Sequence, residues 1–136
     1  MTDRLTSEQR SNLMRRVLGR NTTPELVVRR LVHGAGFRYR LHRKDLPGKP
    51  DLCFPVRRKA IFVHGCFWHG HGCKIGRLPK SHLEFWRPKI ARNRERDQSA
   101  AAALASLGWR VLTVWQCETK DLEALRQRIV EFLSST

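Results

Sequence analysis

The fold is decided by the stretch Asp51-Leu52-Cys53-Phe54-Pro55-Val56-Arg57-Arg58-Lys59-Ala60-Ile61-Phe62-Val63-His64. Its two mostly apolar runs predict two strands, residues 51–56 and 59–64, joined by a tight hairpin turn at the paired arginines. If the two strands pair in this way, Asp51 and His64 fall at the same end of the hairpin. An acid and an imidazole are therefore expected side by side at one edge of a sheet.

Two helices and a strand are predicted ahead of the hairpin. The first helix starts near Thr6, and its apolar residues at helical spacing are Leu13, Met14, Val17 and Leu18. The second starts at Thr23-Pro24-Glu25, with the threonine as N-cap, and ends at Gly34 or Gly36. The residues of this helix expected to face the core are Leu26, Val27, Val28 and Leu31. Residues 37–41 alternate between apolar and polar, which predicts a strand.

The chain after the hairpin is predicted to contain an irregular insert, a long helix, a strand and a last helix. The insert, residues 65–82, is rich in Gly, Cys and His and has little periodicity. The long helix spans about residues 83–107, and Pro88 marks either its first turn or a kink between two helices. A strand follows at 109–115 and an amphipathic helix at 121–133. The apolar stripe of that helix is Leu122, Leu125, Ile129, Phe132 and Leu133.

This order of elements predicts the α/β class. A hairpin followed by a helix and a further strand is typical of a mixed β-sheet flanked by α-helices on both faces. The chain has 136 residues, which fits one domain, and we find no internal repeat or linker. We therefore expect a single domain over residues 1–136, with about residues 1–8 frayed.

A large positive charge restricts the kind of partner. Lys and Arg number 27 against 12 Asp and Glu, giving a formal net charge of +15. Such an excess repels itself in a compact chain, so a bound polyanion is the natural compensation and nucleic acid the first candidate. The alternative is a basic protein without a polyanionic partner. A membrane-surface role would need a basic amphipathic helix or a lipidation signal, and the sequence has neither.

The sequence has no feature of export or membrane insertion. No apolar run follows the first four residues, which predicts that there is no signal peptide, and no stretch approaches ~18 apolar residues. We therefore expect a cytoplasmic bacterial protein that is associated with the nucleoid while it acts. In that compartment four cysteines are expected to be thiols or metal ligands.

A cluster of cysteines and histidines predicts a metal site. Residues 64–73 contain two cysteines and three histidines, and zinc takes thiolate and imidazole ligands in a tetrahedron. The expected ligands are Cys66, Cys73, Cys117 and one histidine. The spacing leaves His69 and His71 open as that histidine. Four protein ligands leave no place for water, so such a zinc is structural; the alternative is core cysteines with surface histidines.

The scarce internal acids indicate hydrolytic chemistry. Mg²⁺ held by one or two carboxylates can polarise a phosphodiester and activate water. Asp51 opens an apolar strand, where a carboxylate is costly unless it is paired or bound to metal. His64 and His69 are candidates for proton transfer near neutral pH, and Glu25 could orient one of them. Alternatively, Asp51 caps a turn and the histidines only pack.

Three aromatic residues lie in or beside polar, basic segments: Phe67, Trp68 and Trp86. Aromatic side chains among cations are typical of base stacking, or of a wedge inserted into a base step. Ordinary core packing is the alternative for these three, and it is the favoured reading for Trp109 and Trp115, which lie within a strand. The nearby arginines expected to neutralise phosphates are Arg87, Arg92, Arg94 and Arg96.

Taken together, these motifs resemble the very-short-patch repair (Vsr-type) endonucleases. The matching segments are Pro47-Gly48-Lys49-Pro50-Asp51, His64-Gly65-Cys66-Phe67-Trp68-His69, Glu84-Phe85-Trp86, and Gly108-Trp109-Arg110-Val111-Leu112 with Trp115 and Cys117. The resemblance runs from about Ser11 to the last helix. It implies a restriction-endonuclease-like core with a structural zinc loop. The Vsr type shares the absence, on the strand after Asp51, of the second acid and lysine usual in the broader superfamily.

The resemblance also implies roles for individual residues. It implies that Mg²⁺ is bound by Asp51 and the main-chain carbonyl of Val63, a position where the family can have Thr. It implies that His64 and His69 carry the proton chemistry, with Glu25 close by. It assigns the zinc to Cys66, His71, Cys73 and Cys117, and so selects His71. It assigns the DNA contacts to Phe67, Trp68 and Trp86 as an intercalating wedge, and to Met14, Lys89 and Asn93 near the mispaired bases.

The activity that the resemblance implies is Mg²⁺-dependent nicking of one DNA strand 5′ to the T of a T·G mismatch. Such mismatches arise by deamination of 5-methylcytosine, here within CT(A/T)GG, and the cut leaves a 5′-phosphate. A monomer is expected, and a MutL-type repair mediator is implied as a partner. Two alternatives are an endonuclease of the same fold with another DNA target, and a non-catalytic zinc-stabilised DNA-binding module. The joint presence of Asp51, His64 and His69 favours a nuclease.

Overall fold

The computed structural model describes residues 22–74, 76–78 and 81–135. These residues include a four-stranded sheet in the order β1-β2-β3-β4. The strands are β1 (Arg40–Leu41), β2 (Leu52–Phe54), β3 (Lys59–His64) and β4 (Arg110–Trp115). Pairing is antiparallel between β1 and β2 and between β2 and β3, and parallel between β3 and β4, so the predicted mixed sheet is confirmed. The predicted helix around Leu13 to Leu18, Met14 and the frayed segment 1–8 lie outside the described residues.

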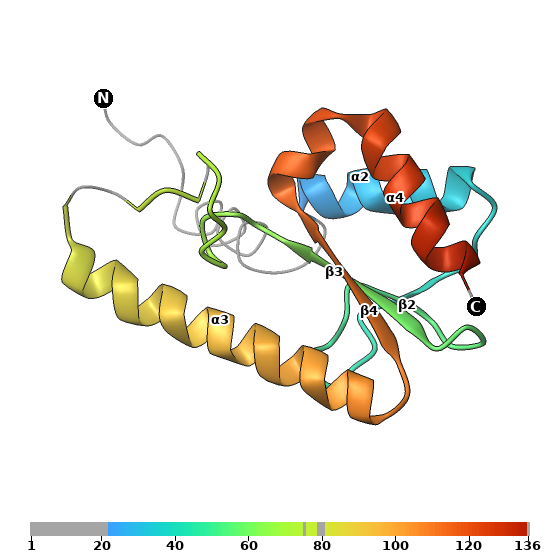
Figure 1. Ribbon diagram of the computed structural model, residues 1–136, viewed down its shortest axis with the longest axis horizontal. Helices are drawn as coiled ribbons and strands as arrows, with labels where there is room; N and C mark the ends of the chain where they lie inside the picture. Colours follow the sequence, from blue (N-terminus) through green and yellow to red (C-terminus); the bar gives the residue numbers. More distant parts are fainter. Residues whose placement is uncertain (1–21, 75, 79–80, 136) are drawn as a thin grey trace, which may run out of the picture.

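Helices cover both faces of the sheet. They are α2 (Thr23–Gly34), α3 (Leu83–Ser106) and α4 (Leu122–Ser134), with a short 3₁₀ helix, η1 (Gln116–Lys120), between β4 and α4. Figure 1 shows α2 and α4 packed together on one face, while α3 crosses the other. The α/β class predicted from the sequence is thus confirmed. Within the described part of the chain, no helix is both long enough and apolar enough to cross a membrane.

Alternation along the central hairpin divides the core into two layers. Leu52 and Ile61, paired in the β2–β3 ladder, face α2 and α4, whereas the next pair, Cys53 and Ala60, faces α3. The first layer is Val28, Val32, Leu52, Phe54, Ile61, Leu112, Val114, Leu125, Ile129 and Leu133. The second is Leu46, Cys53, Ala60, Phe62 and Leu104. The hairpin is therefore buried on both sides, and its position is fixed by both layers.

The structure corrects several local predictions in the helices. Thr22, not Thr23, caps α2, with its Oγ1 accepting a hydrogen bond from the Glu25 N–H at 3.4 Å. The predicted inward residue Leu26 is 38% exposed, and Val32 is buried instead. Leu122, the first residue of α4, is also 51% exposed. In each case the first turn of the helix was assigned the wrong face.

Two prolines and the strand at 37–41 show where the predicted element boundaries differ from the structure. Pro88 lies inside a single continuous α3, so the predicted alternative of two helices is wrong. It is in the second turn, where it removes only one early helical hydrogen bond. The strand predicted at 51–56 ends at Phe54, because Pro55 begins the turn that leads into β3. The strand predicted at 37–41 is likewise reduced to the two residues of β1.

Candidate active site and metal centre

The hairpin brings Asp51 next to the end of β3. Asp51 directly precedes β2, and its Oδ2 accepts a hydrogen bond from the Val63 main-chain N–H at 2.6 Å. His64, the next residue, ends β3. The prediction that Asp51 and His64 lie at the same end of the hairpin is therefore confirmed, and the carboxylate is held beside the Val63 backbone.

The environment of Asp51 disfavours its negative charge. Burial, and to a lesser extent the nearby acid Glu25, raises the pKa of the Asp51 carboxyl to about 6. The hydrogen bond from the Val63 N–H and the charges of His42 and His69 act in the opposite direction but do not outweigh burial. A buried carboxylate with another acid nearby is a setting that a bound cation would stabilise.

His64 and His69 lie together beside this carboxylate. Their imidazole rings are stacked, with centroids 3.9 Å apart and an interplanar angle of 1°. His69 Nδ1 lies 2.5 Å from Asp97 Oδ2, and His64 Nδ1 lies 3.8 Å from the same oxygen. Asp97 comes from the middle of α3 and was not among the predicted site residues. The loop after β3 and the long helix thus build one cluster of two imidazoles and an acid.

His64 is placed as a neutral imidazole. Burial lowers its pKa to about 4, with a further contribution from the neighbouring His69, while Asp97 acts in the opposite direction. Its Nδ1 is a buried atom with no hydrogen-bond partner among residues 22–74, 76–78 and 81–135. A neutral histidine has one nitrogen free of a proton, so His64 presents an acceptor nitrogen, and its lowered pKa makes that nitrogen a weak base.

Glu25 is nearly completely buried at the first turn of α2, with 1% of its surface exposed. Its Oε1 accepts a hydrogen bond from Arg29 Nη2 at 2.8 Å and contacts His42 Nε2. Asp97 contacts both rings, a position that the sequence did not single out. Glu25 is paired with His42, which was also not singled out, and its predicted role in orienting His64 or His69 stays a prediction.

The predicted zinc ligands converge elsewhere on the same loop. Cys66, His71, Cys73 and Cys117 each offer a ligand atom, and these atoms all lie within 4.8 Å of one another. Cys117 Sγ is 3.6 Å from His71 Nδ1, and tetrahedral ligands at ~2.0–2.3 Å from a zinc ion would be roughly 3.3–3.8 Å apart. The Cys117 N–H donates to Cys66 Sγ at 3.4 Å, a contact that would stabilise a thiolate. His71 joins the cysteines, whereas His69 belongs to the Asp97 cluster.

Two thiols of this cluster, Cys66 and Cys117, are not readily deprotonated to thiolates unless a cation is bound nearby. Burial raises the pKa of Cys66 to about 12, and it also raises the pKa of Cys117. A coordinated metal ion deprotonates a cysteine thiol outright. This donor set of three sulfurs and one nitrogen therefore fits a structural zinc ion, with all four positions closed by protein.

Two glycines of the loop lie where a side chain would not fit. Gly70 has φ +65°, and a Cβ there would lie 2.7 Å from Ile90 Cγ2. Gly72, in contrast, has open space around it. A Cβ at Gly76 would lie 1.9 Å from the carbonyl oxygen of His71, so Gly76 packs directly against the backbone of a ligand.

Trp115 lies between the two clusters. Its ring stacks on His71, with centroids 4.3 Å apart and planes at 16°, and meets His64 edge to face at 5.4 Å. Packing was the favoured interpretation for this tryptophan, and for Trp109, which packs against the second core layer. The zinc-type cluster and the hydrolytic cluster are thus joined through one side chain at the end of β4.

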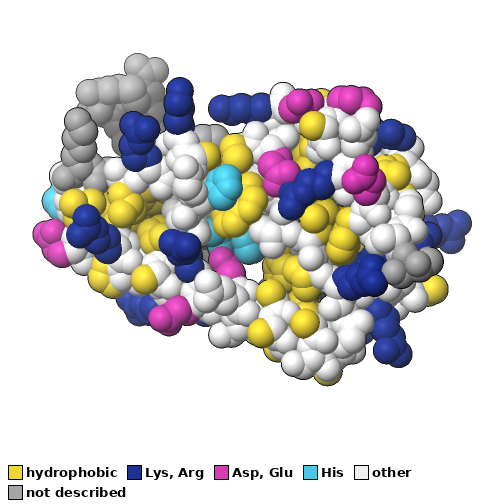
Figure 2. Space-filling view, in the orientation of Figure 1, with side chains coloured by type: hydrophobic (Ala, Val, Ile, Leu, Met, Phe, Trp, Pro, Cys, Tyr) yellow, Lys and Arg dark blue, Asp and Glu magenta, His cyan; other side chains and the backbone are white. Residues whose placement is uncertain are grey.

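Phe67, Trp68 and Trp86 form a single aromatic cluster. Their ring centroids lie 5.0–5.8 Å apart in edge-to-face arrangements, and all three side chains are half-buried. Asn93 Nδ2 donates to the Trp68 carbonyl at 2.7 Å, and Lys89 Nζ lies 5.9 Å from the Trp68 ring centre. Figure 2 shows hydrophobic side chains at the end of the molecule where α3 begins, with Lys and Arg side chains around them.

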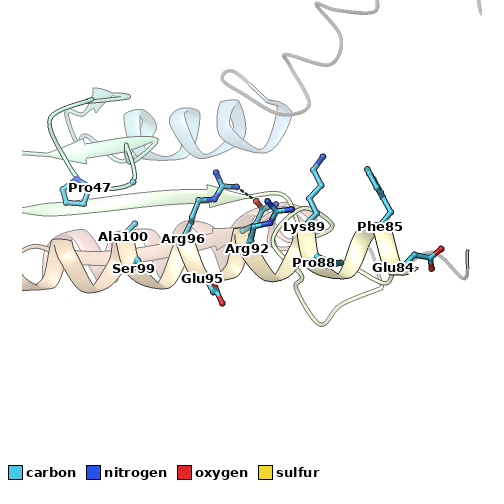
Figure 3. Close-up of a pocket in the computed structure, with 12 residues that line it drawn as sticks. Pro47, Glu84, Phe85, Pro88, Lys89, Arg92, Glu95, Arg96, Ser99 and Ala100 are labelled. Atoms are coloured by element: carbon cyan, nitrogen blue, oxygen red, sulfur yellow. Dashed lines mark hydrogen bonds between the residues drawn. The ribbon is translucent and has the colours of Figure 1, made fainter. Parts of the chain in front are cut away.

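A groove of about 1230 Å³ runs along α3, and one of its lining residues, Phe85, packs edge to face against Trp86 of the aromatic cluster. Phe85, Lys89 and Arg96 point to the same side of the helix, and Pro47 faces them from the neighbouring loop (Figure 3). That loop leads into Asp51 at the start of β2. The charged residues that line the groove are three cations, Lys89, Arg92 and Arg96, and two acids, Glu84 and Glu95.

Comparisons with known proteins agree with this arrangement. Residues 2–75 match the family model described as DNA mismatch endonuclease Vsr. The chain is 62% identical over 133 residues to the type II nicking enzyme V.XorIIP of Xanthomonas oryzae, covering 98% of each chain. It is 41% identical to the type II nicking enzyme V.NmeAIP of Neisseria meningitidis, covering 95% of this chain and 92% of that one. It is 40% identical to the DNA mismatch endonuclease Vsr of Escherichia coli, covering 91% and 83%.

Proposed function

The chain belongs to the Vsr family of DNA mismatch endonucleases, and from this premise we propose that it nicks one strand of a duplex beside a T·G mismatch in a Mg²⁺-dependent reaction. Membership of the family makes it a DNA-nicking endonuclease of mismatch repair. The finer proposal is a cut 5′ to the T that leaves a 5′-phosphate. The observation that carries it is the convergence of Asp51, His64 and His69 at one end of the β2–β3 hairpin.

Asp51 and the Val63 main-chain carbonyl are the proposed ligands of Mg²⁺. The fit rests on the buried carboxylate beside the Val63 backbone, with the second acid, Glu25, close enough to raise its pKa. Mg²⁺ bound there would polarise the scissile phosphate and stabilise charge on the leaving oxygen. Val63 in place of the Thr that the family can have leaves this carbonyl unchanged.

His64 and His69 would move protons. Asp97 holds His69 through Nδ1, and this type of contact fixes the orientation of the ring and leaves Nε2 for proton transfer. His64 is neutral because it is buried, so it suits a proton acceptor. Two stacked imidazoles in different environments are suited to opposite roles, one activating water and the other supporting the leaving group. Which one activates the water is left to experiment.

We further propose a restriction-endonuclease-like core, with zinc at Cys66, His71, Cys73 and Cys117 as its structural ion. The mixed sheet and the closed donor set support this. The ion would hold the loop that carries His69 against the end of β4, since Cys117 lies in η1, directly after that strand. Zinc would in this way support the hydrolytic cluster without taking part in hydrolysis.

Double-stranded DNA would be bound by the aromatic cluster and the groove along α3. Phe67, Trp68 and Trp86 would enter the base stack as a wedge, and unstacking costs least at a mispair. Lys89 and Asn93 would lie near the mispaired bases, and the arginines of α3 would neutralise phosphates. Met14, which lies outside the described residues, is the remaining proposed contact. A MutL-type partner, a monomeric state and the bacterial cytoplasm complete the proposal on the basis of the family.

The test is a nicking assay with Mg²⁺ on end-labelled duplexes that differ only in one pair, T·G against T·A. The expected product is a single nick in the T strand, immediately 5′ to the mispaired T, in the first duplex alone. Equal cutting of both duplexes would contradict the mismatch specificity and support a nuclease with another target. Binding without any cutting would support the non-catalytic DNA-binding module.

A further inference from the structure

A second group of potential metal ligands contains Asp51 but neither of the stacked histidines. Glu25, His42 and Asp51 each offer one ligand atom, and these three atoms lie within 4.8 Å of one another. They come from three segments, namely the first turn of α2, the residue after β1, and the residue before β2. All three side chains are shielded from solvent to a large degree. Their donor set is one imidazole nitrogen and two carboxylate oxygens.

The backbone holds His42 in an unusual conformation that turns it toward this group. Its φ is +48°, in the left-handed region that residues other than glycine seldom adopt. Its N–H donates to the Asp51 carbonyl at 3.4 Å, so the two residues are tied together through the β1–β2 pair. Its Nε2 reaches Glu25 Oε1. The imidazole is therefore fixed between the two acids rather than exposed on the edge strand.

We propose that His42 ligates the divalent cation of the active site together with Glu25 and Asp51, and that this site consequently prefers Mn²⁺ to Mg²⁺. The inference rests on the proposed function in taking Asp51 as a metal ligand, and it adds two ligands and a metal preference. Mg²⁺ is bound by oxygen ligands and waters in near-ideal octahedral geometry. An imidazole nitrogen suits ions of the first transition series better than it suits Mg²⁺.

The structure suggests a different explanation for the same contacts. Arg29 and His42 both bind Glu25 Oε1, and this network could serve only to tie β1 to α2. In that case the nitrogen of His42 stays on Glu25 when metal binds at Asp51. If His42 is a ligand, metal binding replaces its contact with Glu25 by a metal–nitrogen bond. The two explanations therefore differ in whether a nitrogen is bound directly to the ion.

Mn²⁺ is the probe that distinguishes the two explanations, because pulsed electron paramagnetic resonance detects a nitrogen bound directly to this ion. The full chain is first loaded with one equivalent of Zn²⁺, which the sulfur-rich cluster of Cys66, His71, Cys73 and Cys117 prefers, and any excess is removed. Mn²⁺ is then added without DNA, so the result does not depend on nicking. We expect one bound Mn²⁺ per chain with a directly coordinated ¹⁴N. A Mn²⁺ spectrum without nitrogen coupling would overturn the proposal.

Variants identify the nitrogen. His42→Gln should abolish the coupling and weaken Mn²⁺ binding about tenfold or more, while changing Mg²⁺ affinity less. The matched control is His33→Gln, since His33 is an exposed histidine in the last turn of α2, and it should change neither quantity. Coupling that persists in His42→Gln and disappears in His64→Gln or His69→Gln would assign the nitrogen to the stacked pair and overturn the proposal.

Failure of this inference and failure of the proposed function have different signatures. If the ion has only oxygen ligands, the wild-type chain still nicks the T·G duplex, but its Mn²⁺ spectrum lacks nitrogen coupling. If the proposed substrate is wrong, the nitrogen coupling is present and T·G duplexes are not preferred. Circular dichroism of His42→Gln checks that the variant is folded, and the wild-type spectrum tests the proposal without any variant.

Discussion

His69 Nδ1 lies 2.5 Å from Asp97 Oδ2, which pairs a histidine of the loop after β3 with an acid 28 residues later, in the middle of α3. The same carboxylate is 3.8 Å from His64 Nδ1. The long helix therefore contributes a residue to the proposed active site in addition to its packing role, and Asp97 is positioned to set the orientation and tautomer of His69.

Asp97→Asn is expected to lower the single-turnover nicking rate by about 10²–10⁴, because the amide no longer fixes the tautomer of His69 or stabilises its protonated form. DNA affinity, measured by fluorescence anisotropy, should change little, since Asp97 is an acid among cations and is not a proposed DNA contact. Asp45→Asn is the matched control. Asp45 is an exposed acid that pairs with Arg43, so its loss should leave the nicking rate unchanged. Equal rates for wild type and Asp97→Asn would contradict the role given to Asp97.

Asp51 is expected to destabilise the protein when no divalent cation is bound. Its pKa in the folded state, about 6, lies above the ordinary value of 3.8, so the folded state favours the protonated form. Stability from this group is therefore complete below about pH 4 and is lost as pH rises through about 6. Metal-free Asp51→Asn should then be more stable than wild type at pH 8, by roughly 1–3 kcal/mol, with the difference disappearing near pH 4. Urea unfolding at both pH values measures this, and a less stable variant at pH 8 would contradict it.

Gly76 and Gly72 provide a matched pair for the zinc loop. Gly76→Ala places a Cβ 1.9 Å from the His71 carbonyl oxygen, so the backbone of a ligand must move. It should release zinc faster to a chelator and lower the melting temperature. Gly72→Ala meets open space and should stay within about 0.5 kcal/mol of wild type. Similar behaviour of the two variants would show that the close contact at Gly76 is unimportant.

Removal of the structural ion should disrupt the active site. We expect one zinc per chain by elemental analysis, and loss of nicking together with cooperative unfolding at lower temperature after chelation. Cys73→Ser should reproduce this loss, because serine replaces a thiolate ligand. Cys53→Ser is the control, since Cys53 lies in β2, is buried in the core layer that contains Leu104 of α3, and is outside the cluster. Full nicking activity in a protein sample shown to contain no zinc would refute the structural role of the ion.

Local patterns in the sequence predicted the parts of this structure that depend on neighbouring residues. The hairpin follows from two apolar runs around Arg57-Arg58, and the position of Asp51 beside His64 follows from its pairing. The spacing of Cys66 and Cys73 predicted a metal cluster, although the choice of His71 needed the resemblance to the family. The structure supports that choice by bringing His71 to the cysteines and His69 to Asp97.

The features that were missed depend on contacts between distant segments. Asp97 lies in the charged helical run Glu95-Arg96-Asp97, which looks like an ordinary solvated helix face. His42 follows a two-residue strand. Its positive φ and the packing of α2 near this strand bring its side chain to Glu25. Lys59 was correctly predicted to open β3, but the sequence does not indicate that it is buried and donates to the Phe132 carbonyl at 2.6 Å, near the end of α4. No short-range pattern contains this information.

The most direct test of the account is the single-turnover rate of nicking of a T·G duplex with saturating Mg²⁺ by wild type, Asp51→Ala and the surface control Asp45→Ala. A carboxylate that binds the catalytic ion beside two imidazoles predicts a loss of several orders of magnitude in Asp51→Ala, with zinc content and DNA affinity retained, and no loss in the control. A rate for Asp51→Ala within a few-fold of wild type would show that hydrolysis takes place elsewhere.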